Sequence, residues 1–73
     1  MNTQEFDKQV VDVLNERKAL LPTLKRNTSG TVNGNSYTWW RYKTEQTLEA
    51  IGVHAQDARD LTRNLVETYY YNH

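Results

Sequence analysis

Apolar residues in the first third of the chain recur at intervals of three and four positions. The residues that carry this repeat are Phe6, Val10, Val13, Leu14, Leu20, Leu21 and Leu24. Because side chains at these spacings lie on one face of an α-helix, the pattern predicts an amphipathic N-terminal helix. Asn2 or Thr3 can cap its start. Pro22 has no backbone N–H, so the helix is expected to end near Leu20 or Leu21.

The middle of the chain shows a different pattern. A polar stretch, Lys25 to Gly30, leads to Thr31-Val32, then to Asn33-Gly34, and then to the run Tyr37-Thr38-Trp39-Trp40-Arg41-Tyr42. Asn-Gly tolerates the positive φ angles of a type I′ turn, and β-branched and aromatic residues favour strands. The sequence therefore predicts a β-hairpin in this region.

Helical spacing returns after the predicted hairpin. Residues 44–51 suit a short helix, which Gly52 can end because glycine adopts the left-handed conformation at a helix C-terminus. A longer helix is expected from about residue 55 to residue 69, with Ala58, Leu61, Leu65 and Tyr69 on one face. We therefore predict an α+β fold in a single domain of residues 1–73, ordered as an N-terminal helix, a β-hairpin, a short helix and a longer helix. Since a lone hairpin is marginally stable in water, one of its faces must pack on a helix.

Length and composition restrict the function. The chain has 73 residues and no cysteine, which excludes disulfides, thiolate metal sites and cysteine nucleophiles. Its two histidines and three separated glycines form no catalytic or phosphate-binding motif, and His54 with Asp57 or Glu49 would be a weak set of metal ligands. We expect no enzymatic activity, no cofactor and no metal. The sequence shows neither a bilayer-spanning apolar run nor a signal peptide, so we expect a cytoplasmic protein without a membrane partner.

Charge is distributed unevenly although the net charge is zero. Residues 17–43 contain six cations and no anion, whereas residues 1–16 and 44–73 are both acidic overall. The cations of the middle segment are Arg17, Lys18, Lys25, Arg26, Arg41 and Lys43. This asymmetry is either neutralised within the fold or used to bind a partner.

Four of the eight aromatic residues lie in the predicted second strand. On a strand, Tyr37 and Trp39 would share one face, and Trp40 and Tyr42 the other. We expect Trp39 in the core and Trp40 as an exposed anchor beside nearby cations, because tryptophan, tyrosine and arginine are enriched at interface hot spots. The predicted protein-binding residues are Trp40, Arg41, Tyr42, Lys43, Lys25 and Arg26.

We accordingly expect a non-enzymatic module that binds a host protein or a second copy of itself. It would be of the kind that phages or mobile elements use to modulate or inhibit a host complex. A structural homo-oligomer completed by the tyrosine-rich C-terminus is a further alternative.

A different hypothesis comes from residues 46–61, which resemble a helix-turn-helix motif in having a short helix, a glycine in the turn and a second helix. In that interpretation a small DNA-binding protein would face the major groove with His54, Gln56, Arg59 and Arg63. The basic hairpin is the other segment through which such a protein could bind DNA. Residues 46–61 depart from the motif at Leu48 and Ala58, and Asp57 and Asp60 would repel phosphates. An αα-hairpin that only packs within the fold has the same pattern.

Overall fold

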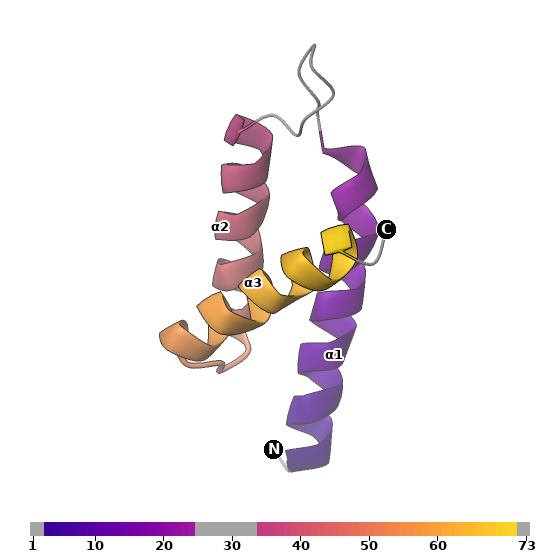
Figure 1. The fold of residues 1–73 in the computed structure, drawn as a ribbon. Coiled ribbons are helices and arrows are strands. Elements are labelled where there is room, and N and C mark those ends of the chain that lie inside the picture. Colours follow the sequence, from indigo (N-terminus) through magenta and orange to yellow (C-terminus); the bar gives the residue numbers. More distant parts are fainter. Residues whose placement is uncertain (1–2, 25–33, 72–73) are drawn as a thin grey trace.

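The computed structural model describes residues 3–24 and 34–71, which form three α-helices and one short 3-10 helix (Figure 1). The elements in chain order are α1 (Thr3–Leu20), η1 (Leu21–Thr23), α2 (Gly34–Ala50) and α3 (Ala55–Tyr71). α1 and α2 pack together and run in opposite directions, and α3 crosses both (Figure 1). The first turns of α1 extend past the other two helices (Figure 1).

The predicted α+β class is wrong, because the described residues contain no strand. Gly34 is the first residue of α2, and the run Tyr37–Tyr42 lies within that helix. The short helix predicted for residues 44–51 is the second half of the same element. Thr31, Val32 and Asn33, which would have formed the rest of the hairpin, lie outside the described residues.

Tertiary burial explains why this aromatic run is helical. Tyr37, Trp40, Thr44 and Leu48 follow one another at helical spacing. Tyr37 is half-buried and the other three are buried, so together they form the inner face of α2. The strand preference of aromatic residues reflects how they pack on neighbours, and here the neighbours are helices.

The turn between α2 and α3 has the hydrogen bonds of a Schellman motif. Val53 N–H donates to the Leu48 carbonyl at 3.0 Å, and Gly52 N–H donates to the Glu49 carbonyl at 3.0 Å. Gly52 has a φ of 106°, as expected for a glycine that ends a helix. The buried side chains of Leu48 and Val53 belong to the same apolar cluster, which fixes the direction in which α3 departs.

The core lies where the three helices meet. It consists of the buried residues Leu48, Val53 and Ala58, against which Phe6, Val10, Val13, Leu14, Ile51 and Leu61 pack. The predicted amphipathic face of the N-terminal helix is therefore confirmed for Phe6, Val10, Val13 and Leu14, whereas Leu20 is exposed and Leu21 and Leu24 lie beyond the end of α1. α1 ends at Leu20, as Pro22 indicated, and α3 confirms the predicted C-terminal helix. The hydroxyl of the buried Thr62 donates to the Ala58 carbonyl at 2.7 Å, so this polar side chain is satisfied inside the core.

Candidate functional site

The outer side of α2 carries exposed aromatic rings. Trp39 is 61% exposed and Tyr42 is 53% exposed. Their rings stack with centroids 5.9 Å apart, and the Lys43 ammonium lies 5.3 Å from the Trp39 ring centroid. Residues three and four positions apart on a helix are neighbours, so α2 itself brings these side chains together. We refer to Trp39, Tyr42 and Lys43 as the α2 aromatic face.

A network of partly buried hydrogen bonds lies next to this face and joins α2 to α1. Trp40 is 3% exposed, and its indole N–H donates to the Arg17 carbonyl at 2.9 Å. Arg17 returns two hydrogen bonds, from Nε to the Thr44 hydroxyl at 2.9 Å and from a terminal nitrogen to the Trp40 carbonyl at 3.3 Å. The guanidinium also lies 5.8 Å from the centroid of the Trp40 ring, within reach of a cation–π interaction. These contacts hold α2 in one orientation relative to α1.

The charge of Arg17 is partly withdrawn from water in this network. Burial lowers the pKa of the Arg17 guanidinium, and the carboxylate of Glu16 opposes that shift. An arginine remains protonated in proteins even so, and the acceptor oxygens of Thr44 and Trp40 compensate for part of its lost hydration. Arg17 therefore acts as a structural cation that supports the aromatic face.

A recess of about 400 Å³ lies between η1 and α2, at the edge of the aromatic face. It is lined by Arg17, Leu20, Thr23, Leu24, Ser36, Trp39, Trp40 and Lys43. Leu20 is 38% exposed at this recess, although it ends a helix whose other apolar residues mostly face inward. The exposed Trp39 therefore stands at an open recess of mixed polar and apolar lining.

The predicted roles of the two tryptophans are reversed. Trp40 is the buried ring and Trp39 is the exposed one, because the segment has the helical period rather than the alternation of a strand. Two other predicted residues, Tyr42 and Lys43, each lie against the exposed ring of Trp39. Arg41 projects from another side of α2, where its Nε lies 3.6 Å from the Glu45 carboxylate. The remaining predicted residues, Lys25 and Arg26, lie outside the described residues.

The residues proposed to read DNA do not share one surface. Gln56, Arg59 and Arg63 line a polar hollow of about 580 Å³ together with Arg41 of α2. His54 lines a different groove, between α1 and the start of α3. Its Nδ1 accepts a hydrogen bond from the Gln56 N–H at 3.3 Å, which caps the first turn of α3.

Acidic side chains also enter the hollow. Asp60 accepts hydrogen bonds from Gln56 at 3.2 Å and from Arg63 at 3.5 Å, and Glu45 pairs with Arg41. These carboxylates neutralise two of the three arginines around the hollow. The repulsion between Asp60 and phosphates was predicted from the sequence, whereas the ion pair of Arg41 with Glu45, one turn further along α2, was not.

Two residues of the candidate site were missed in the sequence. Arg17 contacts side chains that follow it by more than twenty positions, and no local pattern indicates such a contact. Trp39 could have been identified as exposed if residues 37–51 had been treated as one helical segment, because Trp40, Thr44 and Leu48 then define its inner face.

Together these features define, for residues 3–24 and 34–71, an arrangement of three α-helices with the α2 aromatic face exposed on the middle helix. The comparisons identify no particular protein or family, because no protein-family model, curated protein or solved structure matches the chain. Among the helices of residues 3–24 and 34–71, none is long and apolar enough to cross a membrane. The same residues include no group of three or more side chains suited to holding a metal ion.

Proposed function

We propose that this protein is a non-enzymatic binding module that contacts a partner protein through the α2 aromatic face. The observation that carries the proposal is the stacked pair of Trp39 and Tyr42, each more than half exposed. Tryptophan and tyrosine dominate the binding energy of protein interfaces when a partner covers them. The module would occupy a surface on a host complex or on a second copy of itself.

The contacts that hold α2 against α1, beneath the α2 aromatic face, favour a role in binding. The Trp40–Arg17–Thr44 network fixes the helix that carries the exposed rings, and the two rings restrict each other by stacking. A surface that is already ordered loses little conformational entropy when it binds. The adjacent recess beside Leu20 can receive an apolar side chain of the partner.

A protein partner fits this face better than nucleic acid does. The chain has no net charge and so exerts no long-range attraction on a polyanion. Trp39 already stacks on Tyr42 and lies close to Lys43, which leaves less of its ring surface open to bases. Binding is therefore expected to depend on apolar burial and only weakly on salt.

Affinity capture with matched variants tests the proposal. The wild-type protein, Trp39→Ala, Tyr42→Ala and Tyr71→Ala would each be used as bait in a lysate of the source cell, with quantitative mass spectrometry. Tyr71 is the matched control, because it is an aromatic residue that is 86% exposed on a different helix. A specific partner should be retained by Tyr71→Ala and lost from Trp39→Ala.

The Kd between the purified protein and its captured partner gives the quantitative test. Loss of a hot-spot tryptophan should raise Kd by roughly thirtyfold or more. Partners that bind Trp39→Ala as well as they bind the wild-type protein would refute the proposal. Sedimentation of the protein alone would show whether the partner is a second copy.

A second candidate function is DNA binding at the hollow between α2 and α3. The observation that favours it is the convergence of Arg41, Arg59 and Arg63 around one polar surface. Duplex binding should then fall steeply with salt, by roughly one unit of log–log slope per phosphate contact. The Arg59→Ala/Arg63→Ala variant should lose that binding while its fold is retained, and absence of duplex binding by the parent would exclude this function.

A further inference from the structure

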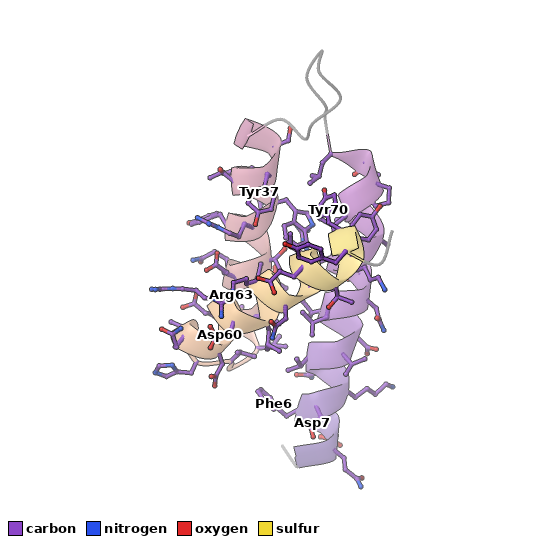
Figure 2. All side chains as sticks on the ribbon, in the orientation of Figure 1. Phe6, Asp7, Tyr37, Asp60, Arg63 and Tyr70 are labelled. Atoms are coloured by element: carbon purple, nitrogen blue, oxygen red, sulfur yellow. The ribbon has the colours of Figure 1, made fainter. Side chains whose placement is uncertain are left out.

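An apolar groove of about 690 Å³ lies between α1 and the beginning of α3. Its floor is formed by Phe6, Val10, Val11, Leu14, Val53 and Leu61. Phe6 projects from α1 toward the turn before α3 (Figure 2), where its Cε2 atom would lie 3.6 Å from a Cβ atom built on Gly52. None of the residues that line this groove belongs to the aromatic face or its recess.

The apolar surface of the groove is incompletely covered within the chain. Val11 is 53% exposed, and Phe6, Val10 and Leu14 are only half-buried although they pack against the core. The first turns of α1 pass beyond α2 and α3, so no helix of residues 3–24 and 34–71 lies against one side of this apolar stripe (Figure 1). A partner that covered these side chains would remove them from water, which is the main driving force of association.

The rim of the groove is acidic. Asp7, Asp57 and Asp60 border it, and the lining includes no lysine or arginine. Asp60 is already paired with Arg63. Within residues 3–24 and 34–71, the carboxylates of Asp7 and Asp57 form no hydrogen bond or ion pair. Two carboxylates therefore remain available at the edge of an apolar surface.

We propose that this groove binds a cationic amphipathic helix of a partner protein. The apolar stripe of such a helix would cover Phe6, Val10 and Val11, and its lysine or arginine residues would meet Asp7 and Asp57. A helix laid in an apolar groove between helices is a common mode of peptide recognition. The negative charge at the rim favours a cationic partner, because carboxylates repel nucleic-acid phosphates and anionic lipid headgroups. This site is independent of the α2 aromatic face.

A designed peptide can serve as the probe. It would be a labelled helix of about 18 residues, or five turns, with leucine at positions i, i+3, i+4 and i+7 and lysine elsewhere. The matched peptide carries glutamate in place of lysine. Fluorescence anisotropy at two salt concentrations should show binding of the lysine peptide that weakens as salt rises, and at least tenfold weaker binding of the glutamate peptide.

Variants of the protein locate the bound peptide. Val11→Lys and Asp7→Asn/Asp57→Asn should each raise Kd by about tenfold or more, since the first places a cation in the groove and the second removes its charged partners. Asp12→Asn is the control, because Asp12 is exposed on the same helix but does not line the groove. It should change Kd by less than about twofold. Circular dichroism should show that Val11→Lys stays folded, because Val11 is already more than half exposed.

Four results would overturn the proposal. Equal binding of the two peptides would show that charge does not select the occupant. An equal effect of Asp12→Asn and Asp7→Asn/Asp57→Asn would show attraction to acidic surface in general. Loss of peptide binding in Trp39→Ala, or self-association that Val11→Lys abolishes, would assign the peptide to the aromatic face or the groove to a second copy.

Discussion

Truncating Trp40 to alanine should destabilise the protein far more than truncating its neighbour Trp39. Trp40 is 3% exposed, stacks near Tyr37 with centroids 6.4 Å apart, and donates its indole N–H to the Arg17 carbonyl. That carbonyl belongs to the last turn of α1, where helical C=O groups lack partners further along the helix. The indole therefore fills space between two helices and also caps one of them.

The magnitude follows from these contacts. Replacing a buried tryptophan by alanine costs about 3–5 kcal/mol. A small domain has a total stability near the low end of the usual range, roughly 5 kcal/mol, because it buries little of its surface. Trp40→Ala should thus leave a large fraction of the molecules unfolded. Trp39 is 61% exposed, so Trp39→Ala should cost about 1 kcal/mol or less.

Thermal and urea denaturation, followed by far-ultraviolet circular dichroism, would measure the difference. For a chain of this length 1 kcal/mol corresponds to a shift in Tm of about 4–8 °C. Trp40→Phe keeps an aromatic ring but removes the indole donor, and should lose about 1–2 kcal/mol through the missing hydrogen bond and the smaller ring. Equal losses in Trp39→Ala and Trp40→Ala, or a larger loss in Trp39→Ala, would refute the helical assignment of this segment.

Three further changes test other parts of the fold by the same denaturation measurements. Val13→Asp should unfold the protein, because it places a carboxylate without a partner against the core; a folded variant would mean that the inner face of α1 is wrongly assigned. Gly52→Ala should cost about 1 kcal/mol through backbone strain at a φ of 106°, and an unchanged Tm would contradict the Schellman turn. Thr44→Val should cost about 1–3 kcal/mol because Arg17 loses a buried acceptor, whereas Thr44→Ser should be milder; equal effects would argue against that hydrogen bond.

The candidate site was only partly predictable. The sequence predicted a binding surface of aromatic and basic residues near position 40, and in the structure Tyr42 and Lys43 each lie against Trp39. Identifying the exposed tryptophan required a choice between strand and helix, because only the helical period puts Trp40 on one face with Thr44 and Leu48 and leaves Trp39 outside. That choice depends on whether α1 covers Trp40, and the covering contact from Arg17 lies far away in the chain.

The local amino-acid sequence determined most of the helix positions and helix ends in this protein. The spacing of apolar residues in α1 and α3, the helix end before Pro22 and the glycine turn at Gly52 follow from backbone geometry and from side chains a few positions apart. The tertiary structure decided that residues 37–42 are helical and that Trp40 lies inside. Aromatic residues have a weak intrinsic preference, and burial against neighbouring elements contributes several times more free energy than that preference does. Packing of Trp40 against α1 therefore outweighed the local preference for a strand. That contact cannot be predicted from the residues near Trp40, because Arg17 lies 23 positions away in the chain.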